Sequence, residues 1–376
     1  MKFEVEREVF AEAVTWVART IPNRPAIPAL AGLKITAGED GQVTLASRDS
    51  DITSHLVMDA AVVESGEILV NGKLLAEISR SLPNKKILFS VNEKKVEIEC
   101  GSAHFSLKTM PLDEYSETHE MPAAAGTVDG SVWQEAVSQV TVAASNDDTL
   151  PMLVSVCIEI EGKNIALMAT DRYRLAVREI EWNPVGQNTK KRILVRASRL
   201  LDLAKSLGTT GEVEIHLDAE NPTLIGFAAG GKTSIIQLTD GEYPQVRTLF
   251  PAEVKGYATI ERTPLLEAIK RSRLVVEKNT SVMLSLEEER ITIEAGHGDR
   301  AQASEAIPAT LNGEGISLAF NPTFLQEGIN SINSRYVRLS YTTANKPAVL
   351  MPEGENGETD ETFKILLMPI RLGTVN

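Results

Sequence analysis

The sequence predicts an α+β protein built from three tandem copies of one domain, each with two helices and roughly eight strands. Two observations lead to this prediction. Two helix-like patterns each recur three times along the chain, and short runs of alternating apolar and polar residues separate them. The length of 376 residues agrees, because it leaves each third of the chain enough residues to bury a core of its own.

The first helical pattern opens each copy. It reads VEREVFAEAVTWVA in the first copy, VDGSVWQEAVSQVTVAA in the second and TIERTPLLEAIKRSRLVV in the third, and each segment contains Glu-Ala followed by Val or Ile. Apolar residues recur at helical spacing, as with Phe10, Val14 and Val17. We therefore expect an amphipathic helix near the start of each domain.

Two of these helices have recognisable start signals. Ser131 followed three residues later by Gln134 resembles a capping box. Thr263 followed by Pro264 is typical of the first residues of a helix. These signals predict that the second and third copies begin their first helix near Ser131 and Thr263.

The second helical pattern has regular spacing. VNGKLLAEISRSLP, VRASRLLDLAKSLG and FNPTFLQEGINSIN begin 125 residues apart in both intervals, which aligns Leu75, Leu200 and Leu325. Each segment has the pattern of a strand end followed by an amphipathic helix of about three turns. These aligned leucines are predicted core positions.

The remaining segments predict strands and two joins between domains. In the first copy LKITA, VTLAS, ILFSV, KVEIE and HFSLKT alternate between apolar and polar residues, as strands with one buried face do. EMPAAAGT and PAEVKGY are rich in Pro, Gly and small residues and are typical of loops. We therefore predict domains at residues 1–122, 127–250 and 257–376.

The composition indicates a protein of the cytoplasm. No stretch approaches the roughly 20 apolar residues of a membrane span, and the first residues, MKFEVEREVF, lack the apolar region of a secretory signal. Cys100 and Cys157, both in strand-like runs, are expected to be buried and reduced. The net charge of -14 argues against a simple DNA-binding surface, but a ring can be positive inside and negative outside.

No motif in the sequence predicts an enzyme, a metal site or a cofactor. Gly226 to Thr233, GFAAGGKT, matches the spacing of a phosphate-binding loop, but SIIQLTDGEYP after it has the pattern of a strand and a turn rather than of a helix. We therefore interpret this segment as a β-turn. The five histidines have no metal-ligand spacing, and Asp49 and Asp171, which are equivalent in two copies, are as typical of turns as of acid or base catalysis.

Basic residues are unevenly distributed over the predicted helices. The helices with the most of them carry these candidates for contact with phosphate, although a solvated helix face explains several equally well: Lys73, Arg80, Arg196, Arg199, Lys205, Lys270, Arg271 and Arg273. Of these, Lys73, Arg80, Arg196, Arg199 and Lys205 are our candidate DNA-binding residues.

Four segments carry a resemblance that covers essentially the whole chain. MKFEVER at the start, ATDRYRLAV from Ala169, DGEYP from Asp240 and MPIRL from Met368 resemble the β subunit of bacterial DNA polymerase III, the sliding clamp. The resemblance implies three DNA-clamp domains and a head-to-tail homodimer that forms a six-domain ring around duplex DNA. It also implies that the chain tethers polymerases without catalysis of its own. DNA contacts would be to phosphate, without readout of base sequence, and Arg24 in PNRPAIP matches a position that the family uses for them.

The resemblance also implies a pocket between the second and third domains. There the family binds short apolar motifs of DNA polymerases, the clamp loader, and repair and mismatch proteins. Arginines at its rim would fix polar atoms of the peptide. The alternative for MPIRL is a last core strand. Carried over by motif, the walls would be Leu153, Thr170, Arg172, Tyr173, Arg174, Leu175, Pro244, Thr248, Leu249, Pro347, Leu366, Leu367, Met368, Pro369, Ile370, Arg371 and Leu372.

The sequence departs from the family in two places that bear on this pocket. Arg172 stands where some members have a small residue, and Gly373 to Asn376 extend past the usual end, so peptide preference can differ. Asp147 and Asp148 lie in a loop that touches DNA in some relatives, and because they would repel phosphate we do not expect that role here.

For the dimer, the resemblance pairs the first domain of one chain with the third domain of another. The candidates are Leu107 on an edge strand, and Val275 with Val276 after the first helix of the third domain. Two other readings compete with the clamp. One is a three-repeat peptide-binding scaffold that never encircles DNA, and the other is a nucleotide-binding enzyme built on residues 226–233.

Overall fold

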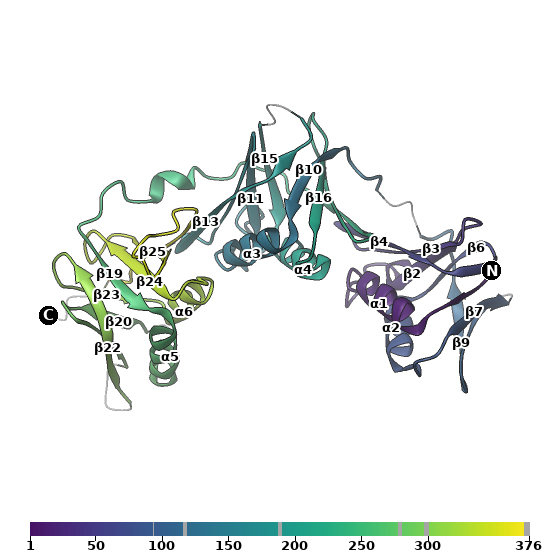
Figure 1. Cartoon of the computed structure of the whole chain (residues 1–376), viewed down its shortest axis with the longest axis horizontal. Coiled ribbons are helices and arrows are strands. Elements are labelled where there is room, and N and C mark those ends of the chain that lie inside the picture. Colours follow the sequence, from purple (N-terminus) through teal and green to yellow (C-terminus); the bar gives the residue numbers. More distant parts are fainter. Residues whose placement is uncertain (93, 116–118, 187–189, 277–279, 297–300, 372–376) are drawn as a thin grey trace. The chain divides into compact units, whose positions relative to one another are not determined.

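The computed structural model describes the chain except residues 93, 116–118, 187–189, 277–279, 297–300 and 372–376 (Figure 1). The described residues form two compact units that alternate along the sequence. Unit 1 consists of residues 1–131, 183–187 and 202–238, and unit 2 consists of residues 132–182, 188–201 and 239–376. The second sequence repeat therefore contributes strands to both units, and each unit is described by itself.

Unit 1 is built on one antiparallel sheet of 14 strands, in the order β14-β10-β16-β17-β18-β4-β3-β2-β6-β9-β8-β7-β1-β5. The sheet joins strands of the first repeat to strands of the second where β4 pairs with β18, with Leu56 opposite Lys232 and Ile52 opposite Ile236. The strands are β1 (Lys2–Val5), β2 (Gly32–Ala37), β3 (Gln42–Arg48), β4 (Ile52–Asp59), β5 (Ala61–Glu64), β6 (Gly66–Asn71), β7 (Ile87–Asn92), β8 (Lys95–Cys100), β9 (Ala103–Met110), β10 (Ala124–Asp129), β14 (Asn183–Pro184), β16 (Glu212–Leu217), β17 (Leu224–Ala229) and β18 (Lys232–Gln237).

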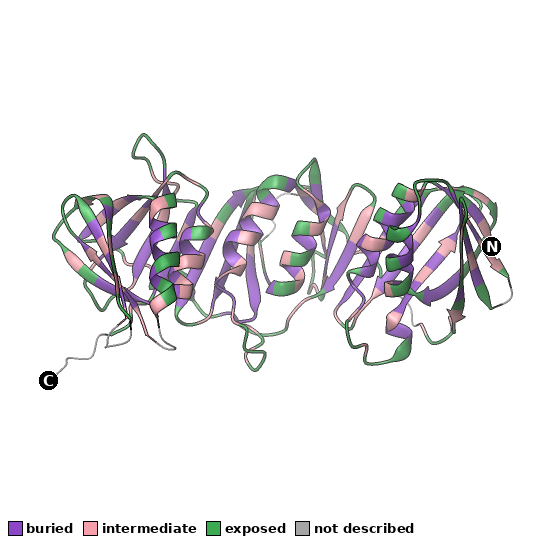
Figure 2. Cartoon of the chain, turned by 90° about the horizontal axis from the view of Figure 1, so that it is seen from below, coloured by how far each residue is buried: buried purple, intermediate pink, exposed green. Residues whose placement is uncertain are grey.

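Helices α1 (Arg7–Ala18) and α2 (Gly72–Ser81) pack side by side in unit 1 (Figure 1), and a short 3-10 helix, η1 (Pro28–Ala31), precedes β2. The residues that the helical spacing predicted, Phe10, Val14 and Val17, are fully buried. Phe10 lies against the stacked pair of Phe3 and Phe89, whose ring centroids are 4.7 Å apart. Figure 2 shows the consequence, with exposed residues along the outer sides of the helices and buried residues in the strands behind them.

Unit 2 has a second antiparallel sheet, of 12 strands, in the order β15-β11-β12-β13-β26-β25-β24-β19-β22-β21-β20-β23. Here β13 of the second repeat pairs with β26 of the third, with Arg174 opposite Leu367 and Arg178 opposite Phe363. The strands are β11 (Ser155–Glu161), β12 (Asn164–Thr170), β13 (Arg174–Glu181), β15 (Lys190–Arg196), β19 (Gly256–Glu261), β20 (Val282–Leu286), β21 (Arg290–Ala295), β22 (Ala303–Asn312), β23 (Ile316–Phe320), β24 (Tyr336–Tyr341), β25 (Ala348–Glu353) and β26 (Phe363–Leu367).

Unit 2 contains α5 (Arg262–Ser272), α6 (Pro322–Asn330) and two 3-10 helices, η2 (Val246–Leu249) and η3 (Arg273–Val275). The side chain of Asn321 caps α6 by accepting from the backbone N–H groups of Thr323 and Phe324. The other two helices, α3 (Gly130–Thr141) and α4 (Ala197–Leu207), each have residues in both units.

The helix starts differ from the sequence prediction by one residue. Helix α3 begins at Gly130, and Asp129 provides the cap, because its Oδ1 accepts both the backbone N–H and the hydroxyl of Ser131. The capping-box prediction for Ser131 is therefore wrong. A carboxylate one residue before the helix is a stronger acceptor than the hydroxyl inside it. Helix α5 likewise begins at Arg262, one residue before the predicted start.

The threefold repeat is visible in the order of elements. Within the described residues, α1 and α2 accompany β1 to β9, α3 and α4 accompany β10 to β18, and α5 and α6 accompany β19 to β26. The three aligned leucines, Leu75, Leu200 and Leu325, are all fully buried, which confirms them as core positions. Cys100 and Cys157 are buried and free of disulfide bonds, as predicted.

Candidate functional site

The turn between β12 and β13 organises the site that the sequence placed around ATDRYRLAV. Asp171 accepts the backbone N–H groups of Tyr173 and Arg174 through Oδ1, at 3.0 Å each. The hydroxyl of Thr170 accepts the N–H of Arg172 and donates to the carbonyl of Arg174 at 2.7 Å. Asp171 is therefore a turn-forming residue, which decides between the two alternatives left open by the sequence.

Arg172 has a left-handed backbone, with φ of 79°. This conformation is strained for a residue with a Cβ and suits glycine better. The bonds of Asp171 and Thr170 hold the turn in this shape nonetheless. Residues with a strained backbone cluster at functional sites.

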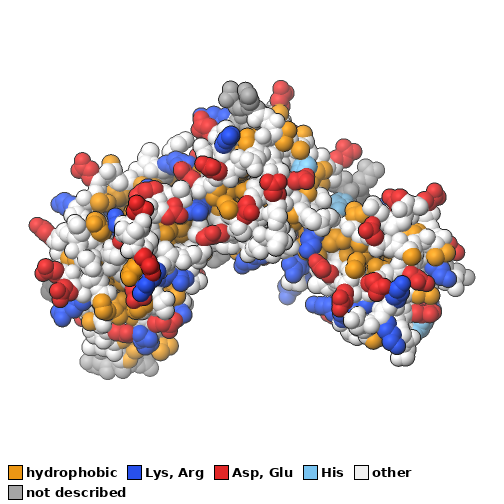
Figure 3. Space-filling model, in the orientation of Figure 1, with side chains coloured by type: hydrophobic (Ala, Val, Ile, Leu, Met, Phe, Trp, Pro, Cys, Tyr) orange, Lys and Arg blue, Asp and Glu red, His pale blue; other side chains and the backbone are white. Residues whose placement is uncertain are grey.

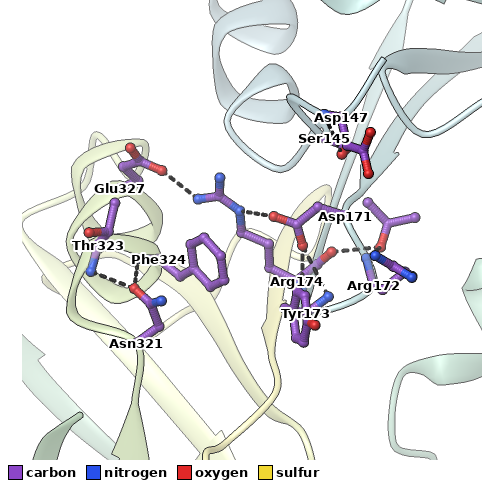
Figure 4. Close-up of polar contacts among 11 residues, drawn as sticks. Ser145, Asp147, Asp171, Arg172, Tyr173, Arg174, Asn321, Thr323, Phe324 and Glu327 are labelled. Atoms are coloured by element: carbon purple, nitrogen blue, oxygen red, sulfur yellow. Dashed lines mark hydrogen bonds and ion pairs between the residues drawn. The ribbon is translucent and has the colours of Figure 1, made fainter. Parts of the chain in front are cut away.

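Arg174 connects this turn to α6 (Figure 4). Its guanidinium forms ion pairs with Asp171 at 2.9 Å and with Glu327 of α6 at 2.5 Å, and its Cζ lies 4.2 Å from the centre of the Phe324 ring. The sequence analysis expected an arginine at the rim, but Arg174 is buried and engaged on both sides. It joins the turn to α6, and its guanidinium is occupied by these partners.

A cavity of about 700 Å³ lies next to the turn. Of the predicted wall residues, Leu153, Arg172 and Pro244 line it directly. The sequence analysis missed the other residues of its lining, which come from β15 and from the segments before β11 and after β18: Met152, Arg192, Leu194, Gly241, Glu242, Tyr243 and Gln245. The DGEYP motif contains three of them, Gly241, Glu242 and Tyr243, and was the available signal for these three.

The core beneath this cavity is apolar. Leu175 and Leu366 pack in one cluster with Cys157, Tyr243 and Val246. Burial raises the pKa of the Cys157 thiol and of the Tyr243 phenol, so both stay neutral near pH 7. Tyr243 belongs both to this buried cluster and to the lining of the cavity.

Exposed apolar side chains lie around the turn. Tyr173 is 58% exposed and Met368 is 41% exposed, and the N–H of Met368 donates to the carbonyl of Tyr173 at 2.8 Å. Leu249 is 54% exposed on η2. Ile370, also exposed, donates its N–H to the carbonyl of Ala319, so the residues after β26 run along the third repeat.

The remaining predicted wall residues differ in exposure. Thr170 and Leu367 are buried, Pro347 and Pro369 are half-buried, and Thr248 and Arg371 are exposed. Leu372, with the four residues after it, lies outside the described residues.

The candidate DNA-binding residues of the first repeat lie at a loop and a helix. Arg24 is exposed. The ammonium of Lys73, on α2, donates to the carbonyl of Pro22 at 2.9 Å and to Oδ1 of Asn23 at 2.8 Å. Lys73 therefore holds the loop that presents Arg24.

The other candidates lie on or beside α2 and α4. Arg80 and Lys205 are exposed and line a second cavity in unit 1. Arg199 is half-buried on α4. Arg196 forms an ion pair with Asp148, so one of the two acidic residues of that loop is neutralised within the chain.

The candidate dimer residues are only partly accessible. Leu107 is buried, although its part of β9 pairs with β8 alone. Val275 and Val276 are half-buried. The sequence analysis passed over Leu274 of η3, which is 85% exposed, because helical spacing gave no reason to separate it from its neighbours.

Comparison with known proteins agrees with this geometry. Models of the N-terminal, central and C-terminal domains of the DNA polymerase III beta subunit match residues 1–119, 127–245 and 247–371. The chain belongs to the DNA polymerase III beta subunit family. Its α+β fold of three tandem clamp domains, predicted from the sequence, is confirmed.

Relatives named beta sliding clamp align with this chain over most or nearly all of its length. The protein of Streptomyces coelicolor is 46% identical over 375 residues, 99% of this chain and 100% of that protein. The protein of Micrococcus luteus is 46% identical over 311 residues, 83% of this chain and 100% of that protein. The crystal structure of the DNA polymerase sliding clamp from Bacillus subtilis has a TM-score of 0.91 at 26% identity, over 99% of each chain.

The other motifs of this clamp have structural explanations. Residues 226–233 form the β17–β18 hairpin, with Ala229 opposite Lys232 and left-handed Gly230 and Gly231 between them, which confirms the predicted β-turn. Among the described residues, no group of three or more His, Cys, Asp or Glu side chains could hold a metal ion. None of the described helices has both the length and the apolar character to span a membrane.

Proposed function

We propose that two copies of this clamp chain associate head to tail into a ring around duplex DNA. The ring tethers replicative and repair polymerases for processive synthesis and has no catalysis of its own. The domains that form it would be residues 1–122, 127–250 and 257–376. The observation that carries this proposal is a pair of free strand edges equivalent to the strands that already join one repeat to the next.

The two internal joins use equivalent strands. In unit 1 the join is β4 with β18, and in unit 2 it is β13 with β26. In each case the fourth strand of one repeat meets the last strand of the next, and the pairing is antiparallel. The threefold repeat leaves one fourth strand, β22, and one last strand, β9, without such a partner among the described strands.

Each of these two strands has one free edge, along residues 103–108 of β9 and residues 303–308 of β22. Among the described residues, positions 103–108 of β9 pair only with β8, and positions 303–308 of β22 pair only with β21. An unpaired edge offers a row of backbone donors and acceptors to a second chain. Pairing β9 of one copy with β22 of another would close two equivalent joins in a two-fold dimer.

The internal joins also suggest the register in which β9 of one copy would pair with β22 of the other. Ala103 follows the β8–β9 turn as Lys232 follows the β17–β18 turn. Ala303 is the first residue of β22 to pair with β21, as Thr53 is the first residue of β4 to pair with β3. At the internal join, Lys232 lies opposite Leu56, three residues after Thr53.

The same register would set Ala103 of one chain opposite Ala306 of the partner, and His104 opposite Glu305. Exposed Leu274, after α5, would gain apolar cover at this join together with Val275. Leu107, Val275 and Val276 remain our proposed dimer residues, and Leu274 joins them.

Contact with DNA would be to phosphate alone, because sliding requires that no base sequence is preferred. The proposed contacts are Arg24, Lys73, Arg80, Arg196, Arg199 and Lys205. The chain carries a net charge of -14, so the proposed basic contacts are local, and topological closure would retain the DNA. A replication factor of this kind would act in the cytoplasm.

We propose the cavity beside the Asp171–Tyr173 turn as the binding site for partner peptides. Its lining combines apolar walls with Arg172 and Arg192, which suits a short apolar motif with few polar groups. The partners would be DNA polymerases, the clamp loader, and repair and mismatch proteins that carry such motifs.

The decisive experiment combines solution mass with DNA retention. Light scattering at micromolar concentration should give about 2 × 40.9 = 81.8 kDa for a dimer. Loaded onto nicked circular DNA with the clamp loader, the dimer should stay bound in high salt and be released when the circle is cut. Retention that does not depend on circularity would contradict the ring, and a monomer that binds peptides without retaining DNA would indicate a peptide-binding scaffold.

A further inference from the structure

Charged side chains line the cavity beside the Asp171–Tyr173 turn, and they are Arg172, Arg192 and Glu242. The rest of the lining is mainly apolar, and all of it belongs to unit 2. A ligand is selected by how much better it binds than its competitors. A charge that the chain already neutralises adds little to that difference, so the state of each of these charges decides what the cavity prefers.

Arg192 is occupied by partners within the chain. Its Nε donates to Sγ of Cys157 at 3.4 Å, and its Nη2 donates to the carbonyl of Pro244 at 3.3 Å. Its guanidinium also forms an ion pair with Glu159 at 3.3 Å. Arg192 therefore joins β15 to β11 and to the segment after β18, and its charge is compensated before a peptide binds.

Arg172 lines the same cavity with an exposed and unpaired side chain. Among the described residues its guanidinium forms no ion pair, whereas Arg174, two residues later, is joined to two carboxylates (Figure 4). The hydrogen bonds of the turn hold the backbone of Arg172 at φ of 79°, which fixes the direction in which its side chain leaves the chain. The turn therefore presents an open guanidinium at the cavity.

Asp147 shows that Arg172 already acts on a carboxylate near it. Hydrogen bonds from Thr149 and, less strongly, the charge of Arg172 hold the pKa of Asp147 below its ordinary value. The carboxylate of Asp147 is taken up by Thr149, whose backbone N–H and hydroxyl donate to it at 3.0 Å and 2.6 Å. Asp147 thus leaves the guanidinium of Arg172 open to a carboxylate from a ligand.

Single charges, rather than a broad field, decide the preference of this cavity. Over unit 2, the face drawn in Figure 3 shows acidic and basic side chains interspersed and not gathered by sign. The carboxylate of the lining, Glu242, is exposed and would repel an acidic residue that lies against it. Any preference for an acidic residue should therefore depend on its position in the peptide.

We propose that Arg172 makes this cavity selective for short apolar peptides that carry an Asp or Glu at the one position that reaches its guanidinium. A planar guanidinium can donate two parallel hydrogen bonds to a carboxylate, which an uncharged amide in the same place does not match. The inference rests on the proposed function and names the chemical class of the partner peptide. A chain with a small residue at position 172 would bind apolar peptides without this preference.

The test measures binding of short labelled peptides of leucine and serine by fluorescence anisotropy. One variable position is moved along the peptide, and each peptide is made with Asp and with Asn there. At one position the parent should bind the Asp peptide about fivefold more tightly than its Asn counterpart. Arg172→Gly should bring this ratio to about one, and because glycine adopts positive φ without strain the turn should keep its shape.

Lys163→Gln is the matched control. Lys163 is exposed in the same unit but lies outside the lining, so the variant loses the same charge and should keep the parent ratio. A parent ratio near one at every position, or an equal loss in both variants, would overturn the role of Arg172.

Binding of the Asn peptides by the parent tests the proposed peptide site separately. A parent that binds them without any preference for Asp would refute the selectivity and leave the peptide site intact. A parent that binds none of the peptides would contradict the site itself, and the selectivity with it.

Discussion

Replacing Arg174 by Met should destabilise unit 2 without unfolding it. Methionine has a similar length and fills the space beside Phe324, but it removes the charge that faces Asp171 and Glu327. Asp171 is then left as a nearly buried carboxylate with only its two backbone N–H donors. Arg174 is the link between the Asp171–Tyr173 turn and α6, so the change tests whether that link holds the pocket.

The magnitude follows from the burial of each partner. Leaving a buried charge unpaired costs about 3–5 kcal/mol, and the two remaining N–H bonds to Asp171 favour the lower end. Glu327 has 45% of its side chain exposed and would return to water at a cost below about 1 kcal/mol. Loss of the contact with Phe324 adds about 1 kcal/mol, which the packing of methionine partly offsets. We expect a total loss of about 4 kcal/mol.

Urea denaturation followed by tryptophan fluorescence measures this loss of stability in unit 2. Trp133 and Trp182 belong to unit 2 and Trp16 belongs to unit 1, so a Trp16→Phe background confines the signal to unit 2. The double variant with Asp171→Asn should recover about half of the loss, because the amide oxygen still accepts from the backbone while the unpaired charge is gone.

The same variants should weaken peptide binding. Arg174 is a positioning residue, so loosening the turn should cost about tenfold in affinity for an apolar peptide, measured by anisotropy. A stability loss below about 1 kcal/mol for Arg174→Met, or no recovery in the double variant, would refute the argument that a buried charge pair holds the turn.

Three further predictions concern other parts of the chain. Leu274→Asp should give a monomer by light scattering at concentrations where the parent is a dimer, whereas Val185→Asp, at a position 71% exposed, should leave the dimer intact; equal behaviour of the two would remove Leu274 from the interface. Gly256→Ala should lower unfolding free energy by about 2 kcal/mol, because its Cβ would come within 2.3 Å of the Tyr341 hydroxyl; a neutral result would show that the tyrosine moves aside. Burial lowers the pKa of His55 below its ordinary value of 6.5. The unfolded chain therefore binds the proton more tightly than the folded chain, and the stability of the fold falls as the pH is lowered through 6.5. The variant His55→Gln should lose this part of the pH dependence, which thermal melts of the variant and the parent at about pH 7.5 and 5.5 would measure.

Much of the fold could be predicted from the sequence because it is repeated and periodic. The spacing of Leu75, Leu200 and Leu325 indicated three equivalent helices, and all three residues are buried. Alternation indicated the strands, and the absence of a helical pattern after Lys232 was enough to replace a nucleotide-binding loop with a hairpin. These are local properties, which neighbouring residues determine.

Contacts between distant segments could not be predicted in the same way. The sequence placed Arg174 at the rim of a pocket, but its burial depends on Glu327 and Phe324, more than 140 residues away. Ser131 has the pattern of a cap, and the position of Asp129 decided otherwise.

The sequence by itself determined the number of repeats, the helices and strands within each, and the apolar positions of their cores, because periodic burial leaves a periodic pattern. Only the tertiary structure decided which strand edges are free and which arginines are neutralised. Edges and charges depend on what lies opposite them in space, and the free edges of β9 and β22 have no pattern of their own in the sequence.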